Sequence, residues 1–320
     1  MKTITVVTPT YNEEDNVEEL YARIKAAFAA MPGYRYEQIF IDNASKDGTV
    51  AKIKALCAED PNVKLIVNVR NFGHIRSPYY GLLQARGDAV ICMASDLQDP
   101  PELFGEFIRQ WEAGYKVVLG VKTASEDTAL MSLARRSYYR LVTRMADVEL
   151  VQNCTGFGLY DQTVLEWLRR LDDPYPYFRG MIAELGFESA KVPYQQPSRK
   201  RGLTKNNFYS LYDLAMLGIT NHSKVPLRLA TMLGFATAGM CLVLAMVYLV
   251  LKLLIWYDFT AGQAPTVIGM FFLGSVQLIF VGILGEYIGA IHTQVLKRPL
   301  VVEKERINFE RVPVSAEPGA

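Results

Sequence analysis

The residues best suited to chemistry lie in the stretch A-S-D-L-Q-D-P-P-E, residues 94–102. An apolar run from Ala89 to Met93 ends there, and the oxygen-bearing side chains of Asp96, Gln98 and Asp99 follow. If the run is a buried strand, these side chains lie at the carboxyl edge of a sheet, where open α/β folds bind substrates. Oxygen ligands suit Mg²⁺ or Mn²⁺, which commonly accompany phosphates. The stretch equally fits a polar loop whose aspartate caps the next helix, so the local sequence leaves both readings open.

Two further polar loops follow earlier apolar runs. The first reads P-T-Y-N-E over residues 9–13, and the second reads D-N-A-S-K-D-G-T over residues 42–49. At the edge of a shared sheet, a Tyr or Pro can contact a planar base, and an Asp or Asn can pair with its polar edge. Each loop alone consists of ordinary turn formers. The three loops in this order favour a nucleotide-binding site.

Several other classes of protein are disfavoured by the sequence. It contains no G-x-G-x-x-G and no G-x-x-x-x-G-K-[ST], which argues against a dinucleotide fold and a P-loop NTPase. The formal net charge of +1 gives no support for a nucleic-acid partner. The four cysteines are scattered without a C-x-x-C pair, which fits reduced structural thiols in the cytoplasm and offers no zinc spacing.

Short apolar runs alternate with helical patterns over residues 4–121. The alternation predicts βαβ units, and therefore an α/β fold with a mostly parallel sheet and helices on both faces. Strands are expected at residues 4–8, 36–42, 63–69, 89–93 and 116–121. Helices are expected at residues 14–30, 48–57, 77–85 and 101–112.

The pattern changes beyond residue 129. A helix is expected over residues 130–146, and it carries Arg135, Arg136 and Arg140. The segment N-C-T-G-F-G-L-Y, residues 153–160, is expected to be irregular. A helix is expected at residues 162–171, then a stretch of unassigned type at residues 178–185, and a strand at residues 188–195 that leads into a basic loop.

Two uncharged apolar segments, residues 229–251 and 266–285, are each long enough to cross the roughly 30 Å hydrocarbon core of a bilayer. Basic residues flank the pair, whereas the connector at residues 256–265 carries no Lys or Arg, and Lys252 at the end of the first segment is the one exception. The positive-inside rule therefore predicts that both chain ends are cytoplasmic. The N-terminus has no secretory signal and already has the pattern of a strand. A buried helical hairpin in a soluble protein is the alternative.

Together the three loops resemble those of family-2-type inverting glycosyltransferases, which have a nucleotide-sugar-binding α/β domain. More narrowly, the chain resembles the polyprenyl-phosphate glycosyltransferases, a group that includes dolichol-phosphate mannose synthase and bacterial undecaprenyl-phosphate sugar transferases. The resemblance extends to F-R-G at residues 178–180, to an R-x-x-G-x-[ST]-K loop at residues 199–205, and to the two apolar segments. It implies an enzyme that moves one sugar, with inversion, from a nucleotide-sugar, expected to be UDP-linked, to undecaprenyl phosphate for cell-envelope glycans.

The resemblance also implies roles for individual residues. Asp96 and Gln98 would hold Mg²⁺ or Mn²⁺, and Asp96, Arg199 and Lys205 would be catalytic. The nucleotide-sugar would be bound by Pro9, Tyr11, Glu13, Asp42, Asn43, Asn71, Asp96 and Gln98. The acceptor phosphate would be bound by Arg135, Arg136, Arg140, Arg199 and Lys205.

The expected organisation is a multi-pass protein of the cytoplasmic membrane. Residues 1–205 would form a cytoplasmic glycosyltransferase domain, and residues 228–292 the two transmembrane helices. Residues 206–227 would form an amphipathic juxtamembrane helix, which either lies in the membrane interface or packs on the soluble domain. Residues 293–320 would be a cytoplasmic tail that ends in a disordered stretch.

Three positions depart from the family pattern. Ala94 replaces the first Asp of D-x-D, and Asn43 replaces the second Asp of D-D. The segment G156-F157-G158 lacks the Arg or Asp that usually stands near its Phe. These departures bear on the metal, the base preference and the sugar rather than on the fold.

Two other functions remain open at this point. A processive polysaccharide synthase is disfavoured because the chain has no Q-x-x-R-W motif and only two candidate spans. A catalytically weak homologue that binds a donor or a lipid as an assembly subunit is supported by Ala94 alone. The expected partners are a nucleotide-sugar, a polyprenyl phosphate and a bilayer, with homo-oligomerisation left open.

Overall fold

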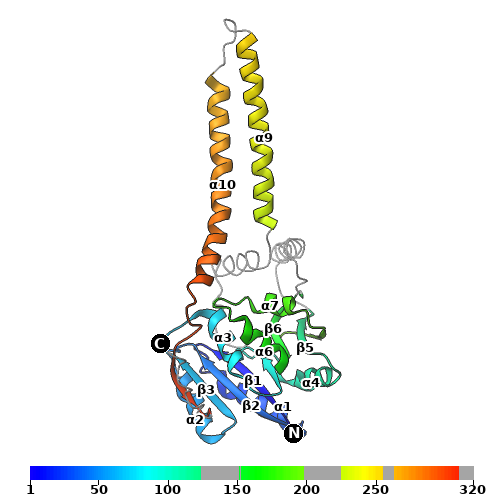
Figure 1. The fold of residues 1–320 in the computed structure, drawn as a ribbon. Helices are drawn as coiled ribbons and strands as arrows, with labels where there is room; N and C mark the ends of the chain where they lie inside the picture. Colours follow the sequence, from blue (N-terminus) through cyan, green and yellow to red (C-terminus); the bar gives the residue numbers. More distant parts are fainter. Residues whose placement is uncertain (124–150, 152, 198–224, 255–262, 310–320) are drawn as a thin grey trace, which may run out of the picture. The chain divides into compact units, whose positions relative to one another are not determined.

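The computed structural model describes residues 1–123, 151, 153–197, 225–254 and 263–309. The chain divides into two units. One contains an eight-stranded sheet with its helices, and the other contains two long C-terminal helices (Figure 1). The predicted helix at 130–146, residues 206–224 of the predicted juxtamembrane helix and residues 310–320 of the predicted tail lie outside the described residues.

The sheet has the strand order β7-β5-β6-β4-β1-β2-β3-β8. Its strands are β1 (Lys2–Thr10), β2 (Tyr34–Asp42), β3 (Val63–Asn68), β4 (Ala89–Cys92), β5 (Val117–Lys122), β6 (Cys154–Asp161), β7 (Ser189–Tyr194) and β8 (Glu303–Ile307). Strand β1 pairs in parallel with β2 and β4, β2 with β3, and β5 with β7. Antiparallel pairings join β6 to β4 and β5, and β8 to β3. The predicted α/β fold is confirmed, with a mixed sheet in which four of the seven strand pairings are parallel.

Helices cover both faces of this sheet, as predicted. They are α1 (Val17–Ala29), α2 (Thr49–Glu59), α3 (Gly73–Gln84), the short η1 (Pro101–Leu103), α4 (Phe104–Glu112), α6 (Gln162–Leu171) and α7 (Phe178–Leu185). Because side chains alternate along a strand, the neighbours Val6 and Val7 are buried on opposite faces. Val6 belongs to a core with residues of α1, α2 and α4, and Val7 to a core with residues of α3, α6 and α7.

The expectation that residues 153–160 are irregular is wrong, because they form most of β6. The two glycines of T-G-F-G suggested a loop, but one allows a close approach of two backbones and the other a positive φ. A Cβ on Gly158 would lie 2.3 Å from the carbonyl oxygen of Val118, and Gly156 has a φ of +98°. Strand β6 thus inserts between β4 and β5 and completes the sheet beside the predicted site.

The sequence did not predict β8, the strand that follows the second apolar segment. Its residues pair with β3, for example Ile307 with Leu65. Side-chain contacts reinforce this edge: the Tyr80 hydroxyl donates to Glu303 at 2.8 Å, and Lys54 pairs with Glu305 at 2.6 Å. The chain therefore leaves the sheet unit after β7 and returns to it after the two C-terminal helices.

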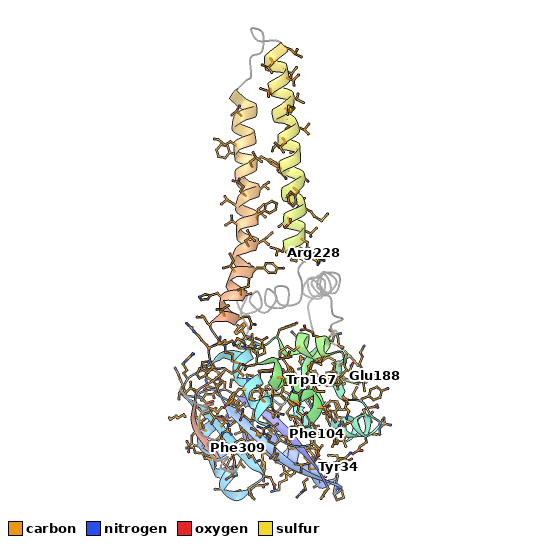
Figure 2. The ribbon with its side chains drawn as sticks, in the orientation of Figure 1. Tyr34, Phe104, Trp167, Glu188, Arg228 and Phe309 are labelled. Atoms are coloured by element: carbon orange, nitrogen blue, oxygen red, sulfur yellow. The ribbon has the colours of Figure 1, made fainter. Side chains whose placement is uncertain are left out.

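Those two helices are α9 (Val225–Leu254) and α10 (Gln263–Val295), and they contain the apolar segments at 229–251 and 266–285. They lie side by side, and Gly234 of α9 faces the ring of Phe280 of α10 (Figure 1). Both are long and apolar enough to cross a membrane. Their side chains project outward along both helices (Figure 2), and most of the large apolar ones are exposed. Phe235, for example, is 76% exposed. The alternative of a hairpin buried within a soluble protein is not seen in the described residues.

Candidate active site

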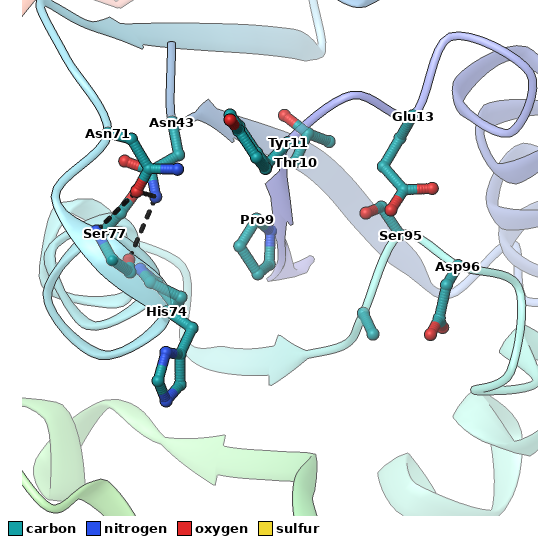
Figure 3. A pocket seen from close by; sticks show the side chains of 13 residues that line it. Pro9, Thr10, Tyr11, Glu13, Asn43, Asn71, His74, Ser77, Ser95 and Asp96 are labelled. Atoms are coloured by element: carbon teal, nitrogen blue, oxygen red, sulfur yellow. Dashed lines mark hydrogen bonds between the residues drawn. The ribbon is translucent and has the colours of Figure 1, made fainter. Parts of the chain in front are cut away.

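A cavity of about 460 Å³ opens at the carboxyl ends of β1, β2 and β4 (Figure 3). The parallel pairing of β1 with both neighbours brings the loops that follow these strands together at one edge. The cavity is lined by Pro9, Thr10, Tyr11, Glu13, Asn43, Asn71, Gly73, His74, Ser77, Pro78, Ala94, Ser95 and Asp96. Six predicted nucleotide-sugar residues from four separate stretches of sequence thus share one cavity.

The first two loops are joined to each other by hydrogen bonds. The backbone N–H of Asn12 donates to the Ser45 hydroxyl at 2.8 Å, and that of Glu13 donates to the Thr49 hydroxyl at 2.8 Å. In the other direction, the N–H of Gly48 donates to the Glu14 carboxylate at 2.7 Å. These bonds hold the first two loops together beside the cavity.

Each of the three loops also contains a non-glycine residue in the left-handed region of backbone space. The φ angles are 54° at Asn12, 62° at Ala44 and 62° at Leu97. Such conformations cost free energy at residues that carry a Cβ, and they persist where the surroundings hold them. Leu97 is held because its side chain is buried in the core on the α1 face. The loops are therefore set by tertiary packing as well as by local sequence.

Asp42 is buried beneath the second loop and is absent from the described residues that line the cavity. Its carboxylate accepts hydrogen bonds from the backbone N–H of Ser45 at 2.9 Å and from the Ser45 hydroxyl at 2.5 Å. Burial raises the pKa of Asp42, although the hydrogen bonds from Ser45 oppose the shift. Through these bonds, Asp42 stabilises the conformation of the loop that carries Asn43.

Both Nδ2 and Oδ1 of the Asn43 side-chain amide make hydrogen bonds within the protein. Its Nδ2 donates to Asn71 Oδ1 at 2.9 Å and to the carbonyl of Gly73 at 3.0 Å (Figure 3). Its Oδ1 accepts from the backbone N–H of Phe72 at 2.8 Å and from Asn68 Nδ2 at 3.3 Å. Asn43 therefore anchors the loop between β3 and α3, which forms one wall of the cavity.

The opposite wall carries the negative charge. Glu13 and Asp96 both line the cavity, whereas none of its described lining residues is a Lys or Arg. Glu13 accepts a hydrogen bond from Asn16 Nδ2 at 2.6 Å. A phosphorylated ligand in this cavity would need cations from elsewhere to offset its own charge and that of the two carboxylates.

The carboxylate loop, residues 94–99, is also tied to β7. Asp99 accepts from the backbone N–H of Ala94 at 2.9 Å and from the Tyr194 hydroxyl at 3.2 Å. Gln98 Nε2 donates to the carbonyl of Pro197 at 3.3 Å. Burial raises the pKa of Asp99 to about 6. Neither η1 nor α4 has a side-chain cap, so the capping interpretation of this stretch is wrong.

The oxygen atoms of this loop suit a metal ion that binds together with a phosphorylated substrate. The described residues contain no group of three or more His, Cys, Asp or Glu side chains arranged to hold a metal. Asp96 faces the cavity, and Gln98 adds an amide oxygen two residues later. Mg²⁺ is commonly bound by one or two carboxylates together with substrate phosphates, which matches a single carboxylate loop of this kind.

The predicted catalytic and acceptor residues other than Asp96 lie outside the described residues: Arg135, Arg136, Arg140, Arg199 and Lys205. The structure adds His74, Ser77 and Ser95 to the cavity wall. It also adds Tyr194, whose contact with Asp99 spans 95 residues of sequence. No local signal marks a contact of that range.

Comparisons with known proteins identify the family of this chain. Residues 5–168 match the family model described as "Glycosyl transferase family 2". The uncharacterized glycosyltransferase YkcC of Bacillus subtilis (strain 168) is 34% identical over 96% of this chain and 94% of its own length. The SfII prophage-derived bactoprenol glucosyl transferase of Shigella flexneri is 33% identical over 94% of this chain and 97% of its own.

Among solved structures, glucosyl-3-phosphoglycerate synthase of Mycobacterium tuberculosis is similar at 18% identity and a TM-score of 0.47. That similarity covers 68% of this chain and 78% of the other. The family match spans more than half of the chain and contains the first three loops, including Asp96. The chain belongs to glycosyl transferase family 2, and it is a glycosyltransferase.

Proposed function

We propose that this enzyme transfers one sugar from a UDP-sugar to undecaprenyl phosphate at the cytoplasmic face of a membrane, with inversion at the anomeric carbon. The observation that carries the proposal is that one chain joins a nucleotide-sized cavity to a pair of apolar helices of spanning length. The named bactoprenol glucosyl transferases, which match over nearly their whole length, support the polyprenyl acceptor and suggest glucose as the sugar.

The base would bind at the end of the cavity formed by Pro9, Tyr11 and Asn71. Tyr11 offers an aromatic ring and Asn71 an amide, the groups that contact the face and the edge of a planar base. The Asn43 network holds this wall in place before any ligand arrives. Preorganisation of this kind reduces the entropy lost on binding.

The diphosphate would lie toward Asp96. Because the described lining carries two carboxylates and no Lys or Arg, a divalent cation is needed to bring a diphosphate there. Asp96 and Gln98 would hold Mg²⁺ or Mn²⁺, and the ion would stabilise the negative charge of the departing UDP. Arg199 and Lys205 are proposed to complete the neutralisation as catalytic residues.

The acceptor phosphate requires positioning rather than deprotonation. A phosphate monoester has a second pKa of about 6 and is largely ionised at neutral pH. Its oxygen would form a bond to the anomeric carbon as the bond from that carbon to the UDP oxygen breaks, and the electron pair would leave on UDP. Attack from the face opposite UDP inverts the anomeric configuration. We assign the acceptor phosphate to Arg135, Arg136, Arg140, Arg199 and Lys205.

Sheet topology supports the proposed membrane arrangement. Strand β7 precedes α9 and β8 follows α10, yet both strands belong to one sheet. A single sheet cannot lie on both sides of a bilayer, so the intervening chain must cross an even number of times. Two spanning helices within residues 228–292 meet this requirement. The basic flanks then favour the cytoplasm for both ends.

The same topology refines the proposed domain boundaries. Residues 1–205 form the proposed cytoplasmic catalytic domain, and residues 206–227 the proposed juxtamembrane helix. Within the segment 293–320, residues 303–307 also contribute the edge strand β8 to the catalytic domain. The chain on both sides of the hairpin is thereby tied to one sheet.

The test is a reconstitution. Purified full-length protein, undecaprenyl phosphate and a panel of UDP- and GDP-sugars are incubated with Mg²⁺ or Mn²⁺, and the lipid product is analysed by mass spectrometry and by NMR of the anomeric centre. We expect a lipid-linked monosaccharide of inverted configuration. Polymer formation would favour a processive synthase. Nucleotide binding without turnover of any donor would favour a binding subunit and overturn the proposal.

A further inference from the structure

Tyr194, the last residue of β7, joins three segments that the sequence alone does not connect. Its hydroxyl donates to Asp99 in the carboxylate loop at 3.2 Å. Its carbonyl accepts two hydrogen bonds from Thr123, from the backbone N–H at 2.9 Å and from the hydroxyl at 3.2 Å. Only 5% of Tyr194 is exposed, so these bonds are made away from water.

The ring of Tyr194 is fixed independently of these polar contacts. It packs edge-on against Phe157 of β6, with ring centroids 5.5 Å apart and an interplanar angle of 75°. The hydroxyl is thus held at a defined place beneath the carboxylate loop by packing on β6.

Asp99 links the Tyr194 hydroxyl to the carboxylate loop through two hydrogen bonds. One carboxylate oxygen accepts from Tyr194, and the other accepts from the backbone N–H of Ala94, at the start of the loop. Asp99 is itself only 5% exposed. The bond from Ala94 closes the loop on itself, and the bond from Tyr194 attaches it to β7. The loop contains the cavity-lining residues Ala94, Ser95 and Asp96.

We propose that Tyr194, acting through Asp99, is a positioning residue that sets the place of Asp96 relative to the ends of β5 and β7. The inference rests on the proposed function, because it assumes that Asp96 serves the reacting end of the donor. The base end of the cavity is built from other loops, so removal of the Tyr194 hydroxyl should disturb the chemical step more than donor binding.

The chain offers a matched control for this contact. Tyr36 of β2 also donates from its hydroxyl to a buried aspartate, Asp60, at 3.2 Å. Neither residue lines the cavity. Tyr36→Phe therefore removes a bond of the same type and length elsewhere in the sheet unit. Thr123→Val is a second control, since it removes the hydrogen bond from the Thr123 hydroxyl to the Tyr194 carbonyl and leaves the contact with Asp99 in place.

The experiment compares Tyr194→Phe, Asp99→Asn and the two controls in the full-length protein. With UDP-glucose and undecaprenyl phosphate, we expect Tyr194→Phe to lower kcat about tenfold and to leave the donor KM within about twofold, because small displacements of reacting groups are costly. Asp99→Asn should move kcat in the same direction. Both controls should retain the wild-type kcat.

Hydrogen exchange provides a readout that needs no turnover. In ligand-free protein, peptides covering residues 94–99 should exchange faster in Tyr194→Phe than in wild type or Tyr36→Phe. Unchanged exchange in this loop, or equal kcat in Tyr194→Phe and Tyr36→Phe, would overturn the inference. Failure of wild-type protein to turn over any donor would instead count against the proposed function, and the exchange comparison would still decide the positioning role.

Discussion

The two ends of the cavity are held in different ways. At the Asn43 end, the Asn43 amide is hydrogen-bonded to the loop that follows β3. At the Asp96 end, the carboxylate loop is hydrogen-bonded through Asp99 to Tyr194 of β7, which lies 95 residues further along the chain. The Asn43 end is uncharged in its described contacts. The Asp96 end combines two cavity carboxylates with a buried third one, Asp99.

The contrast suggests a division of labour between the two ends. An uncharged amide network suits recognition of a base, because it is preorganised and needs no counterion. A cluster of carboxylates repels a diphosphate unless a cation intervenes, so this end suits a step controlled by metal and charge. Substitutions at the two ends should therefore separate effects on KM from effects on kcat.

The largest effect is expected for Asp96→Asn. Loss of the cavity carboxylate should lower turnover by about 10³-fold, because stabilisation of the leaving UDP depends on the cation held there. Steady-state rates at saturating donor and metal provide the measurement. Asp88→Asn, at the other end of β4, is the control and should turn over like wild type. Substantial activity in Asp96→Asn would move the metal-binding role to another residue.

A smaller effect with the opposite kinetic signature is expected for Asn43→Asp. The new carboxylate would face two acceptors, Asn71 Oδ1 and the Gly73 carbonyl, in place of the amide donor. Displacement of this wall should raise the donor KM about tenfold and change kcat much less.

Asn308→Asp provides the matched control for that substitution. Asn308 Nδ2 donates to the carbonyls of Cys57 and Val63 at 2.7 and 2.8 Å, away from the cavity. The change should lower stability and leave KM unaltered. An equal rise of KM in both variants would show that the Asn43 effect is a general loss of structure, which would remove the distinction between the two ends.

The smallest effect on catalysis is expected for Asp161→Ala, which probes the sheet away from both ends. Asp161 accepts from Trp111 Nε1 at 2.7 Å and from Lys116 Nζ at 3.1 Å, and it caps α6 through the N–H of Thr163. Its loss should lower the free energy of unfolding by about 1–3 kcal/mol. Kinetic constants of the folded variant should match wild type.

The pH dependence of that stability loss has a defined sign. Burial acts to raise the pKa of Asp161, but hydrogen bonds from Thr163, Trp111 and Lys116 outweigh it and hold the pKa below its ordinary value. The stabilisation is therefore complete above the ordinary Asp pKa of about 4 and is lost as the pH falls through the folded value. Denaturant titrations should show the wild-type advantage at pH 7 and its decline below about pH 4. An advantage independent of pH would contradict this assignment.

Much of the fold could be predicted because hydrophobic periodicity reports local structure. The α6 boundaries agree with the predicted range, and the first five predicted strands are present. Strand β6 was missed because its glycines suggested a loop, whereas Gly158 is explained by the approach of β5 and Gly156 by its positive φ. Strand β8 was missed because its partner, β3, lies more than two hundred residues earlier in the chain, and no local pattern encodes such a pairing.

The sequence predicted the part of the site that depends on strand ends and missed the part that depends on tertiary contacts. Residues at strand ends, such as Tyr11, Asn43 and Asp96, reach the cavity because parallel strands end at one edge. Asp42 and Gln98 lie beside it in the same loops, and their predicted contacts with the nucleotide-sugar stay predictions. Tyr194 depends on a tertiary contact, which sequence spacing does not reveal.

The contrast between the two ends is tested most directly by calorimetric titration of the full-length protein with uridine and with UDP, each in the presence and absence of Mn²⁺. Uridine should bind with the same affinity in both conditions, because the base end uses uncharged groups. UDP should bind at least about tenfold more tightly with Mn²⁺, and Asp96→Asn should abolish that gain. Equal UDP affinity with and without Mn²⁺ in the wild-type protein would contradict the assignment of the Asp96 end to the metal and the diphosphate.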